Sequence, residues 1–280
     1  KSVSTVKSGA EVVGSGGTAK VGVGASVGVN VGVNTTLAEV ANAAVLNGGA
    51  NMLVNASAEH AMDTEVTGGA GGARIAVTPV AAVSVGINST TARLGTGSAL
   101  NLSGSYGSLA EQTTEQKTVA TGQTQGDQVA VGASLALGVA EDTVVASIER
   151  SVTAALDVDV KAASTRKSDT SAAASVSGGK EADSKGDAAA GESVDQQVKG
   201  QGDSAKDSGK TTADTSGQTD AGGKLTASKG KAAPKAETSQ GGVSVAAAVG
   251  VNVADNTVGA SVARGVTINS GGGALNVGSK

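Results

Sequence analysis

The residues that could carry out chemistry are few and widely spaced in this chain. There is one histidine, His60, and there is no cysteine. A metal site built on several histidines is therefore excluded, and a Ser-His-Asp arrangement could arise only by chance. The carboxylates Glu141, Asp142, Asp157 and Asp159 are scattered, without the pocket-forming residues that paired acid/base catalysis needs. We expect no enzyme activity, no metal site and no cofactor.

Binding to nucleic acid or insertion in a membrane has no better basis. The glycine-rich string GTGSAL (95–100) lacks the GxxxxGK[ST] form of a phosphate loop. The formal net charge is −4, and no basic cluster with interleaved aromatic residues occurs. No run of about 18 apolar residues occurs either. We expect no nucleic-acid partner and no membrane span in this segment.

The composition indicates a thin core. The 280 residues include 43 glycines, one tyrosine (Tyr106) and neither phenylalanine nor tryptophan. The apolar fraction of 39% is mostly alanine and valine. A thick globular core normally contains leucine, isoleucine and aromatic side chains, which bury the most area.

A strict alternation shows which elements hold this thin core. In VGVGASVGVNVGVN (21–34) every odd position is Val or Ala, and every even position is Gly, Ser or Asn. A period of two is typical of a β-strand, and no segment shows a helical period, so we expect an all-β fold. We expect the odd face to form a valine core. The even face, which includes Gly22, Gly24, Gly28 and Gly32, is then expected to lie close against another sheet, of the same chain or of another chain.

The pattern recurs at a fixed interval. Asn34 and Ala38 are followed by equivalent residues 54 positions later, and again after a further 54. The next copy is displaced by 114 positions. Such a repeat favours stacked units that bury a shared core and align equivalent residues in ladders. The expected ladder residues are Asn34, Asn88, Asp142 and Asn256, together with Ala38, Ala92, Ala146 and Ala260.

These observations predict a repetitive β-solenoid, resembling a parallel β-helix, with units of about 54 residues. Each unit could form two coils of about 27 residues or three of about 18. A solvated polar insertion over about 166–240 interrupts the third unit. The expected divisions are 1–20 (the tail of an upstream unit), 21–74, 75–128, 129–242 (which contains the insertion) and the partial unit 243–280.

The stretches GVGASVGVNVGVNTTLAEV and VNASAEHAMDTEVTGGAGG resemble repeats of giant bacterial surface adhesins, the filamentous haemagglutinin-like and leukotoxin-like filamentous adhesins. The resemblance covers the repeat units and not the insertion. It implies a long β-solenoid stalk, export through the outer membrane, and a role in adhesion or biofilms. No functional residue of the family maps onto a position here.

The sequence therefore favours a structural and adhesive segment of a large extracellular or cell-surface protein. Its expected partners are neighbouring repeats of the same longer chain, with lateral self-association through the small-residue face, and the host or neighbouring-cell surface that it meets is not identified. The alternative is a self-assembling fibre or sheath subunit whose filaments form through that face. Binding to ice, carbohydrate or mineral is disfavoured, because no threonine ladder recurs and Tyr106 is the only aromatic residue.

Overall fold

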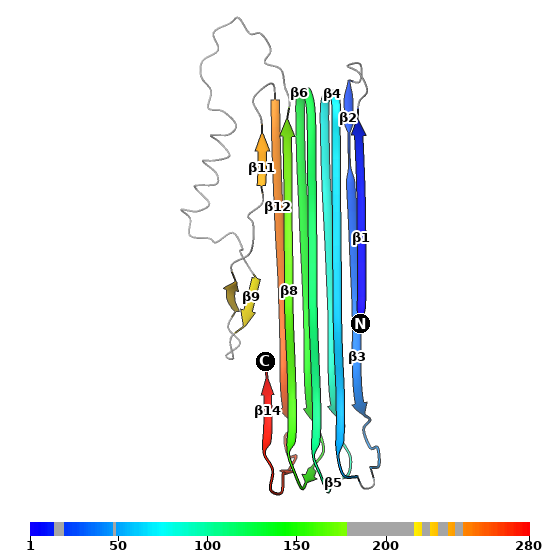
Figure 1. Ribbon diagram of the computed structural model, residues 1–280, viewed down its shortest axis with the longest axis vertical. Helices are drawn as coiled ribbons and strands as arrows, with labels where there is room; N and C mark the ends of the chain where they lie inside the picture. The colour runs from blue at the N-terminus through cyan, green and yellow to red at the C-terminus, as the bar shows by residue number, and fades with distance from the viewer. Residues whose placement is uncertain (14–19, 47–48, 178–215, 220–224, 229–234, 239–242) are drawn as a thin grey trace, which may run out of the picture.

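The computed structural model describes residues 1–13, 20–46, 49–177, 216–219, 225–228, 235–238 and 243–280. Within these ranges the chain consists of strands without any helix, and most of the strands pair in parallel (Figure 1). The prediction of an all-β fold is confirmed. The described part of the chain accordingly contains no helix that could cross a membrane.

Two strands account for much of the chain, since β4 and β6 each contain 43 residues. The strands are β1 (Ser2–Val13), β2 (Val21–Val23), β3 (Ser26–Val40), β4 (Met52–Leu94), β5 (Leu100–Leu102), β6 (Tyr106–Ile148), β7 (Val152–Ala154), β8 (Val158–Ser177), β9 (Ser216–Thr219), β10 (Leu225–Ser228), β11 (Lys235–Thr238), β12 (Val243–Val262), β13 (Ile268–Asn269) and β14 (Leu275–Ser279).

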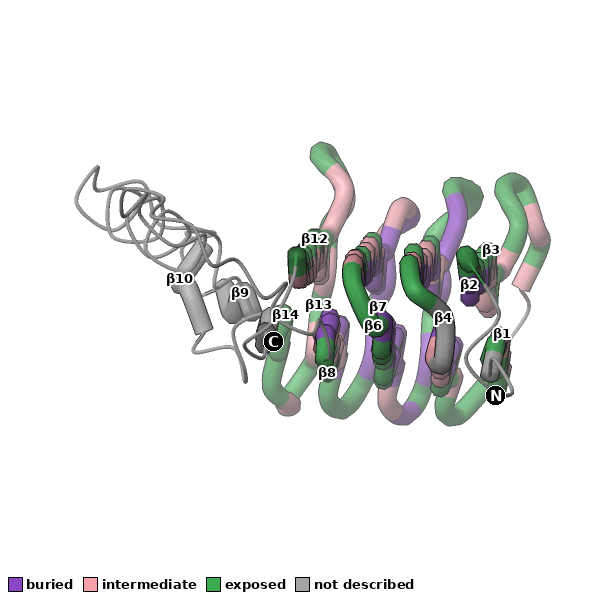
Figure 2. The backbone as a smooth tube through the Cα atoms, turned by 90° about the horizontal axis from the view of Figure 1, so that it is seen from above, coloured by how far each residue is buried: buried purple, intermediate pink, exposed green. Residues whose placement is uncertain are grey.

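The long strands fold back on themselves. In β4, a Cβ placed on Gly68 would lie 2.5 Å from Val80, and one on Gly86 would lie 3.0 Å from Met62. The two halves of β4 therefore face each other through their side chains (Figures 1 and 2). We call the sheet of β1, β8 and the first halves of β4 and β6 the ascending wall. The sheet of β2, β3, β12 and the second halves of β4 and β6 is the descending wall.

Hydrogen-bonded neighbours within each wall lie far apart in the sequence. Met52 pairs with Tyr106, and Asn88 pairs with Asp142, both across 54 residues. The step from β6 to β12 is the 114 residues that separate Val129 from Val243. Within the walls, the described residues show no parallel strand pairing at an interval of about 27 or about 18 residues, so both expected coil lengths are wrong. The ascending strand, its return and the short strands β5, β7 or β13 at the lower end together use the whole interval.

The valine face lies on the opposite side from the one predicted. In β3, Val27, Val29 and Val31 are exposed, whereas Gly28 and Asn30 are buried. The physical reason is the narrow space between the walls. A Cβ on Gly28 would lie 2.5 Å from Val66 of the ascending wall, so the inner position opposite Val66 accommodates only a small residue. The expected close packing of the even face occurs against the other wall of the same chain.

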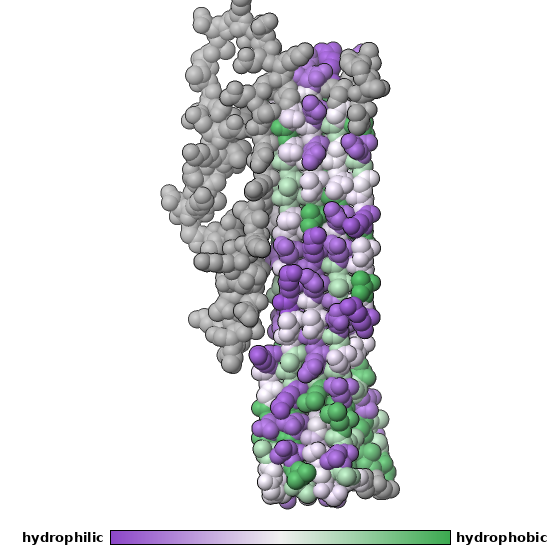
Figure 3. Space-filling view, in the orientation of Figure 1, coloured by the Kyte–Doolittle hydropathy of each residue, from purple (hydrophilic) through white to green (hydrophobic). Residues whose placement is uncertain are grey.

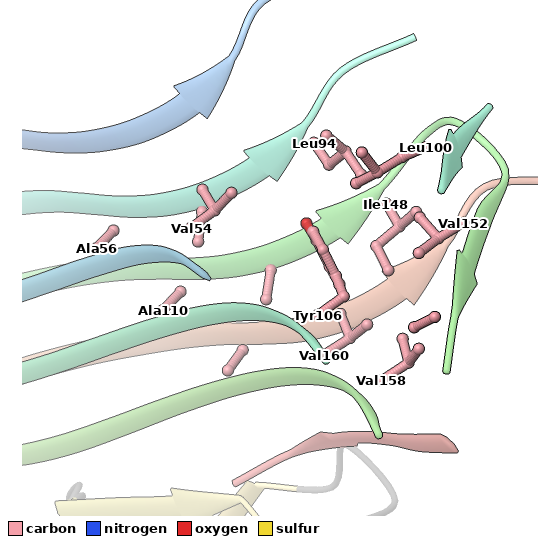
Figure 4. Close-up of a cluster of buried hydrophobic side chains, with 14 of the residues drawn as sticks. Val54, Ala56, Leu94, Leu100, Tyr106, Ala110, Ile148, Val152, Val158 and Val160 are labelled. Atoms are coloured by element: carbon pink, nitrogen blue, oxygen red, sulfur yellow. The ribbon is translucent and has the colours of Figure 1, made fainter. Parts of the chain in front are cut away.

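The core between the walls changes character along the strands. At the lower end it is apolar and contains Leu94, Tyr106 and Ile148, all at most 1% exposed (Figure 4). In the upper half Val66 and Val80 pack among alanines. Seen along the strands, the two walls form two facing rows (Figure 2). Buried polar side chains separate the two apolar clusters.

Residues 166–177 are not part of a polar insertion. They continue β8 and pair with β6, as Arg166 does with Thr114 and Val176 with Thr124. Small and polar residues fill the inner face throughout this fold, so a scarcity of large apolar residues did not mark the end of a strand. Of the remaining expected insertion, only β9, β10 and β11 are described, and the other residues lie outside the described ranges.

Candidate functional site

The expected asparagine ladder forms one inner row of the descending wall. The side-chain amide of Asn34 donates to Asn88 Oδ1 over 2.8 Å, and the amide of Asn88 donates to Asp142 Oδ1 over 2.8 Å. Asn256 is the register partner of Asp142, but its Oδ1 is buried without a hydrogen-bond partner among the described residues. The structure therefore brings all four residues together and links three of them by side-chain hydrogen bonds.

The alanine ladder is a neighbouring inner row. Ala38 pairs with Ala92, Ala92 with Ala146, and Ala146 with Ala260. Ala92 and Ala146 are fully buried in the lower apolar cluster. A methyl group is the largest inner side chain that this row presents to the ascending wall.

Asp142 is held by groups from both walls. Gln112 and Thr114 of the ascending wall donate to Asp142 Oδ1 over 2.8 and 3.2 Å. The guanidinium Nε of Arg166 lies 3.2 Å from Asp142 Oδ2, and both side chains are buried. Arg166 also donates to the carbonyl of Ala140. Burial lowers the pKa of Arg166 from its ordinary value, and the nearby Asp142 charge opposes that shift.

This cluster is closed to a substrate. Asp142 is 1% exposed, and its carboxylate already has partners on both oxygens. The adjacent Glu141 points to the opposite, solvent-facing side of the same strand. Asp157 and Asp159, the other carboxylates noted in the sequence, hold the backbone of Ala274 and the side chains of Lys161 and Asn276. The described residues contain no group of three or more His, Asp or Glu side chains that could hold a metal ion.

His60 lies in the same polar layer, in the inner row that also contains Ser2, Thr114 and Arg166. It is 5% exposed, and neither ring nitrogen has a hydrogen-bond partner among the described residues. Burial lowers the pKa of His60, although the charge of Asp142 acts in the opposite direction. The ring is therefore a neutral part of the interior.

We call an ascending strand together with the descending strand that follows it one level of the stack. At the lower end, Arg150 joins three successive levels. Arg150 is 2% exposed, and its guanidinium donates to the carbonyls of Ala41, Ala44, Gly95 and Thr96. These carbonyls follow the descending strands of the two preceding levels. Backbone oxygens take the place of a carboxylate partner, and the rigid fork of arginine suits several acceptors at once.

Ion pairs on the outer surfaces also join neighbouring strands of the stack. Arg93 lies between Glu39 at 3.1 Å and Glu149 at 3.0 Å, which belong to the levels on either side of it. On the ascending wall, charged partners stand opposite one another on adjacent strands, in the pairs Lys1–Glu59, Lys7–Glu65, Asp63–Lys117 and Glu115–Lys167. Each exposed pair contributes little stability, but mismatched like charges would disfavour a shifted register.

The four glycines expected to pack closely are on the inner face. Gly22, Gly24 and Gly28 are buried, and Gly32 is half-buried beside Met62. A Cβ on Gly24 would overlap the backbone carbonyl of Gly69. Lateral association of chains through this small-residue face, as expected from the sequence, is therefore wrong, because the other wall of the same chain covers it.

Sequence reasoning missed Arg150 and Arg166. Both stand at even positions, as the buried polar residues His60, Gln112 and Asp142 do, and this parity was the available signal. Comparisons with protein-family models, with curated proteins and with solved structures found no match to this chain.

Proposed function

We propose that this chain is a segment of a β-solenoid in which each 54-residue unit forms one complete turn. The register carries the proposal. Asn34, Asn88 and Asp142 stack at intervals of 54 residues, and the same interval relates Met52 to Tyr106 and Ile75 to Val129. A single unit has no second layer of neighbours to hold its inner polar groups, so stability comes from stacking.

The role that this architecture supports is structural and adhesive. The buried charged side chains that catalysis would need hold the fold together instead. Asp142 forms an ion pair with Arg166, and Arg150 donates hydrogen bonds to backbone carbonyls. No strand of the described residues pairs with the outer edge of β3 or of β12, so both edges are open to further turns. Together with the resemblance to filamentous adhesins, this supports a non-enzymatic segment of a large extracellular bacterial surface protein.

A pair of deletions tests the architecture. Removal of residues 75–128 takes out one 54-residue unit and joins Arg74 directly to Val129, the register partner of Ile75. The shortened chain should keep its strand content and unfold cooperatively. The control removes residues 83–135, a deletion that is one residue shorter and joins Ala82 to Ala136 within a strand, so that the rest of this strand turns to the opposite face. That one-residue difference should abolish cooperative folding, as followed by circular dichroism and denaturant unfolding.

Equal tolerance of the two deletions would contradict the proposed turn. The location is tested separately with antibodies raised against this chain. They should label intact cells of the source bacterium as strongly as lysed cells, and protease added to intact cells should remove the signal. Labelling only after lysis would overturn the surface assignment and leave the architecture unaffected.

A further inference from the structure

The outer face of the descending wall is apolar over a wide area. On each of its four stacked strands, six successive outward positions contain only Val, Ile, Leu, Ala or Pro. We call this surface the valine face. It consists of the odd-numbered residues of 21–31, 75–85, 129–139 and 243–253.

The two walls differ sharply on their outer sides. The ascending wall has hydrophilic side chains across its middle (Figure 3), including the Lys7–Glu65 and Glu115–Lys167 pairs. The valine face has no charged or hydrogen-bonding side chain at any of its positions. An ordinary solvated sheet face is polar, so this difference marks the descending wall as a contact surface.

Charged residues border part of the face. In the row just below it, two strands contain Glu141 and Asp255, whereas the other two continue with the exposed residues Val33 and Ile87. Lys20 and Arg74 stand just above it. The side chains inside these limits are open to solvent in the isolated chain: Val31 is 62% exposed at one edge of the stack, and Leu135 is 43% exposed in an inner strand. Large apolar patches with a polar rim are typical of protein interfaces.

We propose that the valine face binds the valine face of a second copy of this chain. Eleven strand residues and four strands define a surface of about 36 Å by about 19 Å, or about 700 Å². This is close to the ~800 Å² per partner that stable interfaces bury. Short branched side chains allow two pleated sheets to approach to about 10 Å with nearly aligned strands. A self-complementary apolar surface suits a two-fold interface.

This proposal names a partner for the proposed solenoid. It does not need the solenoid for this chain alone. It rests on the solenoid only for longer chains, because each further turn would widen the valine face. The two can fail separately. The deletion pair reports on register, whereas the variants below change the outer face and leave the register intact.

The first experiment uses the absence of cysteine in the chain. Val83→Cys places one thiol on the valine face, and Ser57→Cys places one on the ascending wall as the control. The thiol at position 83 should react at least about tenfold more slowly with a maleimide above the dimerisation concentration than below it, because the interface excludes the reagent. The thiol at position 57 should react at one rate throughout.

The second experiment measures the association itself by sedimentation equilibrium. The pair Val83→Lys and Leu137→Lys places lysines on adjacent strands in the centre of the face. It should raise the dimer dissociation constant by about 100-fold or more, because an interface buries unpaired charge poorly. The pair Thr113→Lys and Thr165→Lys adds the same charge to the ascending wall and should leave the constant unchanged. The milder pair Val83→Thr and Leu137→Thr keeps strand-forming residues and should weaken the dimer by a smaller factor.

Three results would overturn the proposal. One is a chain that stays monomeric at every concentration at which it is soluble. Another is an oligomer that resists both the lysine and the threonine pairs, which would assign association to the open edges of β3 and β12. The last is binding to phosphatidylcholine vesicles that the lysine pair abolishes, without self-association in their absence, which would make a lipid surface the occupant.

Discussion

Arg166 of the ascending wall forms an ion pair with Asp142 of the descending wall, with 3.2 Å between Nε and Oδ2 and both side chains buried. The pair joins the two sheets across the interior. Asp142→Asn would keep an oxygen for Gln112 and would copy Asn34 and Asn88 of the same row, but it would leave the guanidinium without its ion-pair partner. We expect a loss of about 3 kcal/mol in the free energy of unfolding, measured by denaturant titration.

The double variant Asp142→Asn with Arg166→Thr provides the control. It copies the residues one strand along in each wall, since Asn88 is the register partner of Asp142 and Thr114 is the register partner of Arg166. We expect the double variant to be more stable than Asp142→Asn alone. Strictly additive losses would show that the pair is not coupled.

The narrow space between the walls predicts a contrast between two glycines. Gly24→Ala should destabilise the chain by about 2 kcal/mol, since its Cβ would overlap the carbonyl of Gly69 and the backbone would have to move. Gly259→Ala should change stability by less than about 0.5 kcal/mol, because nothing lies within 4 Å of its Cβ position. Thermal unfolding of the two variants beside the parent chain measures the difference, and equal effects would contradict the close inner packing.

Arg150 should be hard to replace. Lysine at this position has one ammonium for the carbonyls that the two preceding levels of the stack direct at the guanidinium, and the unsatisfied oxygens would remain buried. Arg150→Lys should cost about 2–3 kcal/mol. It should also speed hydrogen exchange at the amide of Ala43, which donates to Thr96 at this end. Arg93→Lys, at an exposed ion pair, should cost less than about 1 kcal/mol.

His60 predicts a loss of stability in mild acid. Its folded pKa lies below the unfolded value, so the folded chain favours the neutral ring and the unfolded chain takes up the proton more readily. The contribution of His60 is therefore fully present above the unfolded pKa of about 6.5 and declines as the pH falls from there towards the folded pKa. The unfolding midpoint of the parent chain should fall in this range. The variant His60→Gln should lose less stability over the same range, and an identical decline in both chains would exclude His60 as the cause.

The sequence predicted the strands and the alignment of equivalent residues better than it predicted which side of each strand is buried. The alternation of 21–34 revealed the strands, and the 54-residue interval placed Asn34, Asn88 and Asp142 in one row. The prediction of the buried face was wrong because alternating valine and glycine normally indicate that the valines form the core. Here the second wall approaches so closely that glycine is the inner residue, and valine remains outside.

Two kinds of residue contained information about orientation. The charged residues Glu39, Glu59 and Arg93 share odd positions with the exposed valines, whereas the large apolar residues Leu94 and Tyr106 share even positions with the glycines. Solvent exposure of charge is a firmer guide than the size of a small apolar side chain. The Asp142–Arg166 pair could not be predicted, since it depends on which level of one wall faces which level of the other.

The interval of 54 residues has a consequence for shape. In the proposed solenoid, each turn advances the stack by only one strand spacing, about 4.8 Å, so the chain would use roughly 11 residues for every ångström of axial length. Strands of about 20 residues make the object about 65 Å broad. A longer chain of this kind would therefore gain surface area much faster than it gains axial length.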